Sequence, residues 1–290
     1  MNMKRKSPRK KGPIFEVARR LAKNKSAMIG LAIVILLIVV AVTAPLFYSY
    51  DEQIIKQNIG NRLQSPNAEN LLGTDALGRD LLGRIIYGSR ISLYVGFTTV
   101  AFAFVVGGTL GALGGYFGGI VDNIIMRFMD IFLAIPGTLF AITIAAALGS
   151  NIRNLILALA ISSVPGFARI LRSSVITVRE VEYIEASRAI GASDARIILN
   201  HVIPNALAPV IVHTTLNVAT IILTIAGLSF LGLGISAPTP EWGAMLSDGR
   251  TYLKTHFYMS LFPGVAIIMT ILSLNLLGDG LRDALDPRLK

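Results

Sequence analysis

The sequence of 290 residues contains no cysteine, which excludes disulfide frameworks, thiolate metal sites and cysteine nucleophiles. Its three histidines never form an H-E-x-x-H pattern, so the zinc ligands of a zincin-type intramembrane protease are missing. Neither G-x-x-x-x-G-K-[ST] nor G-x-G-x-x-G occurs, so the chain has no phosphate-binding loop of its own. If ATP drives this protein, another subunit must bind it.

Charged residues are also scarce. They make up 15% of the chain, against about 25% in an ordinary soluble domain, while residues of the set AVILMFWYC make up 53%. The net charge of +10 is concentrated at one end, where ten of the 27 Lys and Arg residues lie between Lys4 and Lys25. A basic leader before an apolar chain favours attraction to anionic lipid headgroups over nucleic-acid binding. We therefore expect a lipid bilayer as a partner and no nucleic acid.

Six stretches are long and apolar enough to cross a bilayer core of about 30 Å, which takes roughly 20 residues. The first, 27–47, has no charged residue and is longer than the apolar region of a signal peptide, so it is interpreted as a retained span. The other five are expected at about 93–114, 124–148, 152–170, 207–235 and 258–277.

The distribution of basic residues orients these spans. With the N-terminus in the cytoplasm, 19 Lys and Arg residues lie inside and 8 outside, as the positive-inside rule requires. The expected fold is therefore an all-α integral membrane bundle of six transmembrane helices with both termini cytoplasmic. Its parts are a basic segment 1–26, the first span 27–47, an extracytoplasmic segment 48–92, a five-helix core 93–278 that contains a cytoplasmic loop 171–206, and a cytoplasmic tail 279–290.

Few ionisable residues lie within the spans. Arg127 and Asp130 are three residues apart, which predicts an ion pair on one helix face or, alternatively, a gate or proton relay. His213 and Asn217 are one turn apart and either pack within the bundle or line a pathway. No central row of Asp, Glu or Lys exists, which disfavours a carrier driven by protons or sodium.

Glycines recur every four residues in the second span and at its exit, at positions 107, 111, 115 and 119. Small residues at this spacing lie on one helix face and let two backbones approach closely. The stripe predicts either ordinary close packing or a surface along which helices slide.

The cytoplasmic loop contains two short helical patterns, at about 180–190 and 193–202. Gly191 can take a positive φ and close the first helix, and Ser193 or Asp194 can cap the second. Pro204 is expected to stop the second helix. Such a compact helix–turn–helix, held between two membrane helices, could transmit force because it cannot move without moving its neighbours.

These residues resemble a known motif. Glu185-Ala186-Ser187, then Gly191, then Ile203-Pro204, is similar to the EAA loop of ABC-importer permeases, whose pattern is E-A-A, three residues, G, nine residues and I-x-L-P. The chain departs from that pattern at Ser187, His201 and Ile203. The ATPase-coupling residues that the resemblance implies are Glu182, Glu185, Ala186, Ser187, Gly191, Ala192, His201, Ile203 and Pro204.

Other segments resemble the peptide-import branch of this family. They are LGTD at 72–75, LGRD at 77–80, YGSRIS at 87–92, the stretch 127–136 and the closing LGDGLRDALDP at 277–287. Length and the basic leader are similar to those of the C-type permease of dipeptide and oligopeptide transporters. Related nickel, glutathione and oligosaccharide importers share these motifs.

The resemblance implies a non-catalytic subunit in the cytoplasmic membrane of a prokaryote. It would pair with a second, homologous permease, two cytoplasmic ATPases and an extracytoplasmic solute-binding protein. ATP and Mg would be held by the ATPases, and this chain would bind no cofactor or metal. Two alternatives stay open, namely the same architecture carrying nickel or another small solute, and a stand-alone secondary carrier or channel.

The extracytoplasmic segments offer candidate contacts for the binding protein. Thr74-Asp75 is a good capping pair, and apolar residues between Leu77 and Ile86 recur at helical spacing, which predicts an amphipathic helix at the membrane surface. Asp75, Arg79 and Asp80 either belong to a scaffold or contact the binding protein. Trp242 is either an interfacial anchor or part of a second docking surface.

Overall fold

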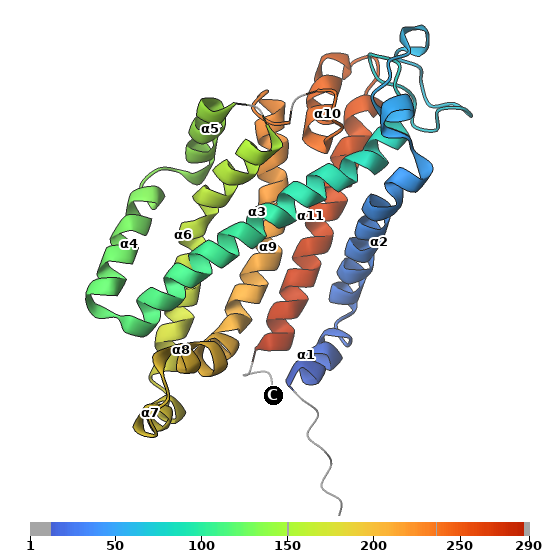
Figure 1. Ribbon diagram of the computed structural model, residues 1–290. Helices are drawn as coiled ribbons and strands as arrows, with labels where there is room; N and C mark the ends of the chain where they lie inside the picture. The colour runs from blue at the N-terminus through green and yellow to red at the C-terminus, as the bar shows by residue number, and fades with distance from the viewer. Residues whose placement is uncertain (1–12, 150, 236, 287–290) are drawn as a thin grey trace, which may run out of the picture.

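The computed structural model describes residues 13–149, 151–235 and 237–286. The basic leader before residue 13 and the tail from residue 287 therefore lie outside the described residues. Within them every regular element is helical, apart from an isolated bridge between Thr74 and Asp80. The long helices are α2 (Lys25–Phe47), α3 (Leu81–Phe117), α6 (Ile152–Arg179), α9 (Ile203–Phe230) and α11 (Tyr258–Leu285) (Figure 1).

Five helices are long and apolar enough to cross a membrane, and a bent pair raises the number of spans to six. The expected all-α membrane bundle is thus confirmed. A short helix α1 (Pro13–Leu21) precedes α2 and lies at the same end of the molecule as the end of α11 (Figure 1). There Arg20 Nη1 donates to the carbonyl oxygen of Asp286 at 3.3 Å.

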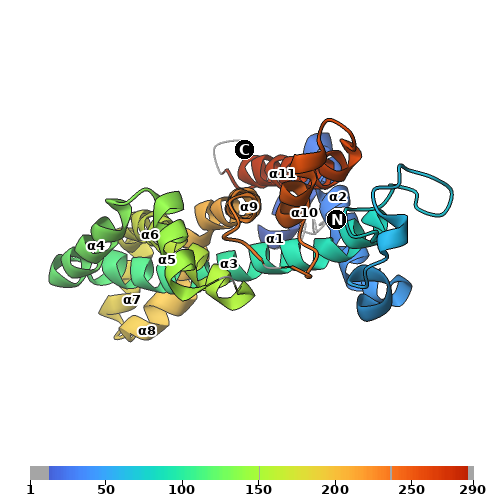
Figure 2. The ribbon, with the colours of Figure 1, turned by 90° about the horizontal axis from the view of Figure 1, so that it is seen from above.

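Helix α3 begins earlier than expected. A surface helix over 77–86 and a separate span from residue 93 were predicted, but the structure has one helix of 37 residues. Nothing between Leu81 and Phe117 breaks the apolar helical pattern, and at about 1.5 Å per residue the helix is about 55 Å long. A helix longer than the bilayer core must tilt, and α3 runs obliquely across the bundle, along one side of α9 and α11 (Figure 2).

The glycine stripe of α3 packs against α6. A Cβ atom at Gly107, Gly111 or Gly115 would come within 2.4, 2.2 or 2.8 Å of a carbonyl oxygen of α6, too close for any side chain. Gly119 is not part of this contact, because it opens α4 with φ +54° and faces open space. The stripe is therefore a close-packing surface of three glycines.

The third predicted span, 124–148, is not a single helix. It consists of α4 (Gly119–Leu133) and α5 (Gly137–Leu148), which meet at an angle of 81°. Pro136 lies in the break, where its missing N–H and its ring prevent an uninterrupted helix. The hydropathy of this stretch was correctly identified, but its geometry was not.

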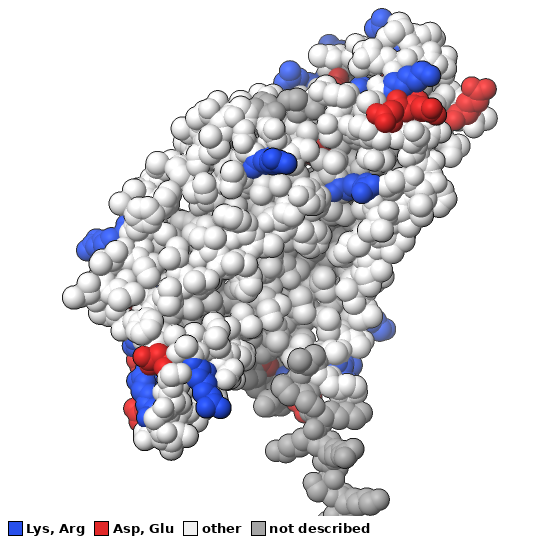
Figure 3. Space-filling model, in the orientation of Figure 1, with Lys and Arg blue, Asp and Glu red and all other residues white. Residues whose placement is uncertain are grey.

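The connections at the far end of the bundle are compact. Short turns η1 (Tyr50–Ile54) and η2 (Ile59–Asn61) lie in the long connection before α3, and α10 (Trp242–Gly249) and η4 (Arg250–Tyr252) lie between α9 and α11. Charged side chains gather at this end and at the opposite end, whereas the face between them is largely uncharged (Figure 3). That distribution matches a bundle whose middle lies in lipid.

Candidate functional site

The cytoplasmic loop folds around its glycine. Helix α7 (Glu182–Ala189) ends where Gly191 takes φ +82°. The N–H of Gly191 donates to Arg188 O at 2.9 Å and the N–H of Ala192 donates to Ser187 O at 3.1 Å, which closes the helix in the manner of a left-handed C-terminal cap. The predicted role of Gly191 in the backbone is confirmed.

The second half of the loop differs from expectation. Helix α8 (Asp194–Ile197) continues through a π-turn, η3 (Ile198–Val202), directly into α9, so Pro204 does not stop a helix. Pro204 lies in the first turn of α9, where a missing N–H costs little. The wide π-turn before it also leaves room for its ring. Ser193 occupies the cap position of α8, although its side chain makes no capping hydrogen bond.

The loop is anchored to the end of α3. The Tyr116 hydroxyl donates to Asp194 Oδ1 at 2.6 Å, and the Arg188 guanidinium lies over the Tyr116 ring at 5.3 Å. Arg179 Nη1 donates to Gly115 O at 2.9 Å, which joins the end of α6 to the same turn of α3. Loop and bundle are therefore connected through Tyr116.

Apolar residues of the loop fall into a buried and an exposed set. Ile184, Ile197 and Val202 are fully buried and hold the loop against the bundle. Four others, Val181, Tyr183, Ile190 and Leu199, are exposed, and Ile190 is 85% exposed. Exposed apolar residues on a charged loop are typical of a protein-binding surface. We call these four residues, together with α7 and Gly191, the loop surface.

The sequence-predicted loop residues lie on or beside this surface. Ser187 is half-buried, and its hydroxyl donates to the Tyr183 carbonyl oxygen at 2.8 Å. A Cβ atom at Gly191 would meet nothing within 4 Å. Glu182, Glu185, Ala186 and Pro204 are exposed, and Ala192, His201 and Ile203 are half-buried.

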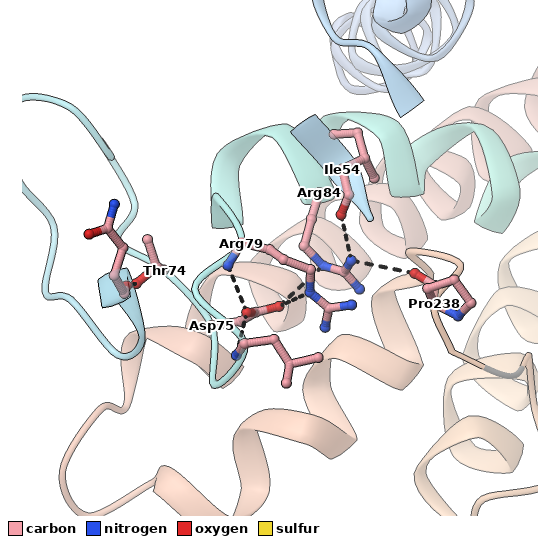
Figure 4. Close-up of polar contacts among 8 residues, drawn as sticks. Ile54, Thr74, Asp75, Arg79, Arg84 and Pro238 are labelled. Carbon is pink, nitrogen blue, oxygen red and sulfur yellow. Dashed lines mark hydrogen bonds and ion pairs between the residues drawn. The ribbon is translucent and has the colours of Figure 1, made fainter. Parts of the chain in front are cut away.

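At the opposite end, a buried ionic cluster holds the outer connections together (Figure 4). Asp75 accepts from Arg79 Nε at 2.6 Å, and Arg84 Nε lies 3.5 Å from the same carboxylate. Arg84 Nη1 donates to the carbonyl oxygens of Ile54 at 2.9 Å and Pro238 at 3.4 Å. All three charged side chains are at least 90% buried. The cluster joins three segments that are far apart in the sequence.

This burial corrects the predicted docking role of Asp75 and Arg79. Asp75 and Arg79 offer no exposed surface to a binding protein. Asp80, rather than Thr74-Asp75, caps the helix, because its carboxylate accepts from Gly83 N at 2.7 Å. Partial burial raises the pKa of the Asp80 carboxyl, although backbone N–H groups at the helix start favour its charged form.

Trp242 is neither an interfacial anchor nor a docking residue here. It is 1% exposed, and its Nε1 donates to Ile85 O at 2.9 Å. The preceding Glu241, whose capping role the sequence did not predict, accepts from the N–H groups of Gly243 and Ala244 at 2.8 Å each. Glutamate is an unusual residue at a helix N-terminal cap, so the sequence around Glu241 did not indicate the start of α10.

The predicted ion pair of Arg127 with Asp130 does not form. Asp130 accepts instead from Arg169 Nη2 on α6 at 2.6 Å. The spacing along one helix made Arg127 the expected partner of Asp130. It gave no information about α6, whose Arg169 lies 39 residues further along the chain. A second pair between α4 and α6, Asp122 with Arg172, also went unpredicted.

His213 and Asn217 lie where α9 meets its neighbours. The His213 ring packs edge-on against Phe167 of α6, with centroids 4.8 Å apart. Asn217 Oδ1 is buried and has no hydrogen-bond partner among the described residues. The described residues also contain no group of three His, Asp or Glu side chains that could hold a metal ion.

Comparisons with known proteins assign the chain to a transporter family. Residues 104–290 match the family described as "Binding-protein-dependent transport system inner membrane component", and residues 12–66 match the "N-terminal TM domain of oligopeptide transport permease C". The inward-facing MetNI methionine ABC transporter resembles the fold with a TM-score of 0.58 at 19% identity, over 71% of this chain and 98% of that one.

Two curated relatives are similar over almost their full length. The dipeptide transport system permease protein DppC of Alkalihalophilus pseudofirmus is 49% identical over 278 residues, which cover 96% of this chain and 91% of the relative. The glutathione transport system permease protein GsiD of Escherichia coli O6:K15:H31 is 42% identical over 280 residues, 96% of this chain and 91% of the relative. The chain therefore belongs to the binding-protein-dependent transport system inner membrane components, the permeases of ABC importers.

Proposed function

We propose that this chain is one of two permease subunits of an ABC importer for dipeptides or oligopeptides. Its 49% identity to a dipeptide permease over nearly the whole chain supports this cargo. Glutathione, the cargo in the name of a second relative, is itself a small peptide. A peptide substrate therefore accounts for both relatives, and nickel or another small solute is the alternative cargo.

The loop surface is the proposed contact with the ATPases. The observation that carries this proposal is an exposed apolar set beside Glu182 and Glu185, on a loop anchored to α3 through Tyr116. A surface that is both exposed and anchored can receive a push and pass it to the membrane helices. ATP-driven closure of the ATPase pair would then favour one state of the bundle by binding it better than the other.

The remaining parts of the complex follow from this role. Two ATPases would hold ATP and Mg on the cytoplasmic side, a second permease would complete the path, and a binding protein would deliver peptide from outside. The chain itself would carry out no catalysis. A stand-alone carrier would need no such loop surface.

The test is a pair of loop substitutions in the assembled transporter. Glu185→Lys reverses an exposed charge, and Gly191→Asp adds a charged side chain at a positive φ that faces open space. We expect each to lower the amount of ATPase that co-purifies with the permease, and to lower peptide uptake, by at least fivefold. Membrane insertion of the permease should be unchanged.

Matched controls lie at the other end of the molecule. Gly232 has φ +78° and, like Gly191, nothing within 4 Å of an added Cβ atom, so Gly232→Asp imposes the same backbone strain. Glu69→Lys reverses an exposed charge there. Both controls should retain the ATPase. Normal ATPase content and uptake in the loop variants would contradict the proposal and favour a stand-alone carrier.

A further inference from the structure

Helix α6 carries a polar stripe on the side opposite α3. Its members are spaced three or four residues apart and so share one helix face. None is buried, whereas Val164, Ala168 and Val175 on the opposite face are buried against α3. The stripe consists of Ser162, Gly166, Arg169, Ser173 and Thr177, and we call it the polar face of α6.

A half-exposed ion pair lies on this face. The side chains of Arg169 and Asp130 are 54% and 48% exposed, although both belong to segments apolar enough to span a membrane. The neighbouring pair of Arg172 with Asp122 is more covered, at 33% and 14%. Charges in a membrane segment are costly beside lipid and normally face a protein interior or a water-filled cavity.

The break between α4 and α5 gives an independent indication. Residues 134–136 are not helical and are all exposed. Non-helical backbone at membrane depth is tolerated only where protein covers it or where it lines water, because lipid satisfies no backbone hydrogen bonds. Asp130 lies one turn before this break, so the ion pair and the break belong to the same surface.

His213 of α9 lies next to the polar face. An added Cβ atom at Gly166 would lie 3.7 Å from His213 Nε2. By contrast, the exposed residues of α2 within 28–47 and of α11 within 258–272 are apolar and suit lipid, for example Ile35 at 51% and Ile268 at 64%. The molecule thus has lipid-compatible faces and one polar face.

We propose that the polar face of α6 lines the water-filled path for the cargo, and that the Asp130–Arg169 pair contacts the charged ends of a zwitterionic peptide. This inference rests on the proposed function. The Arg169 guanidinium has five N–H donors and, among the residues that the structure describes, makes one hydrogen bond, to Asp130, so it can receive a peptide carboxylate. Asp130 can accept from a peptide ammonium group.

The first experiment measures access of water to this face. Because the chain has no cysteine, single cysteines can be introduced as Ser162→Cys, Ser173→Cys and Thr177→Cys, with Ile35→Cys and Ile268→Cys as exposed apolar controls. The assembled transporter in membrane vesicles is treated with a charged methanethiosulfonate. We expect labelling of the polar-face cysteines at least tenfold faster than labelling of the controls, and slower labelling with saturating dipeptide.

Equal labelling rates at Ser173→Cys and Ile268→Cys would overturn the proposal, since lipid or the second permease would then cover the face. Peptide uptake by the unmodified transporter is measured in the same vesicles. Uptake without labelling contradicts only the assignment of the path. If the unmodified transporter shows no ATP-dependent peptide uptake, the proposed function is wrong.

The second experiment separates a path role from a structural ion pair. Arg169→Gln and Asp130→Asn should each lower dipeptide uptake at least tenfold while the ATPase still co-purifies. The exchanged pair, Asp130→Arg with Arg169→Asp, preserves the attraction between α4 and α6 but reverses the charges offered to the peptide. Uptake should remain low in the exchanged pair. Recovery of uptake would show that the pair is structural and would overturn the proposed contact.

Discussion

At the scale of single residues, the outer cluster is centred on the carboxylate of Asp75. Asp75 is the acidic partner of both Arg79 and Arg84, and all three side chains are buried. Asp75 also accepts from the backbone N–H groups of Leu77 at 2.9 Å and Arg79 at 3.0 Å. Asp75 therefore forms ion pairs with two buried guanidinium groups and fixes the turn before α3, while the Asp248 carboxylate attracts both groups from α10.

Removal of that charge should destabilise the outer end. Asp75→Asn leaves two guanidinium groups buried without their acidic partner, which typically costs about 3–5 kcal/mol. We expect a lower thermal unfolding midpoint of the purified complex. Glu69→Gln, at an exposed side chain in the same connection, should leave the midpoint unchanged. Equal midpoints for the Asp75 variant and the unmodified protein would mean that the cluster contributes nothing to stability.

At the scale of elements, the α3–α6 contact depends on where a glycine lies. In Gly111→Ala the new Cβ atom would lie 2.2 Å from Ala168 O, so the backbones must separate. Overpacking of this kind costs about 1–3 kcal/mol. Gly108→Ala is the matched control, because the atom nearest to its new Cβ atom would be Leu171 Cδ2, at 3.4 Å. There alanine stabilises the helix by about 0.5–1 kcal/mol relative to glycine.

Only Gly111→Ala should therefore lower the stability of the complex. Thermal unfolding of the purified complex should give a lower midpoint for Gly111→Ala, and an unchanged or higher midpoint for Gly108→Ala. If both variants lowered the midpoint equally, the cost would come from any change in α3 and not from contact with α6.

The same elements show what a sequence can and cannot predict. Apolar runs were enough to locate the five membrane-length helices and the apolar stretch of the α4–α5 pair, because lipid imposes apolar length on each segment separately. Gly191 was predictable because a left-handed turn restricts the residue type locally. The angle of the α4–α5 break was not predictable, since a proline marks a break without setting its direction.

Side-chain partners were the least predictable feature of the candidate sites. Asp130 was expected to pair with Arg127 on its own helix, but α6 provides Arg169. Arg84 reaches the carbonyl oxygen of Pro238, which lies 154 residues away in the chain. Such contacts depend on how helices pack, and helical periodicity within one segment contains no information about the neighbouring segment.

At the scale of the whole molecule, this multi-pass protein of the bacterial inner membrane has two ends with different construction. The outer end is held by buried charges and a buried Trp242. The cytoplasmic end has an exposed loop surface that is joined to the longest helix through Tyr116, whose hydroxyl donates to Asp194 and whose ring lies beneath Arg188. Helix α3 crosses the bundle and packs against both α6 and α9 (Figure 2). A movement of the loop that shifts α3 would therefore shift α6 and α9 as well.

Tyr116→Phe tests whether that connection transmits force. The substitution removes the hydrogen bond to Asp194, a bond to a charged group worth about 1.5–3 kcal/mol, but keeps the ring beneath Arg188 and leaves the loop surface intact. We therefore expect a normal complement of bound ATPase, with the ratio of peptide taken up to ATP hydrolysed lowered several-fold. Tyr94→Phe, an exposed position on the same helix, should keep the normal ratio. An unchanged ratio in Tyr116→Phe would mean that the loop drives the bundle through α6 and α9 alone, without α3.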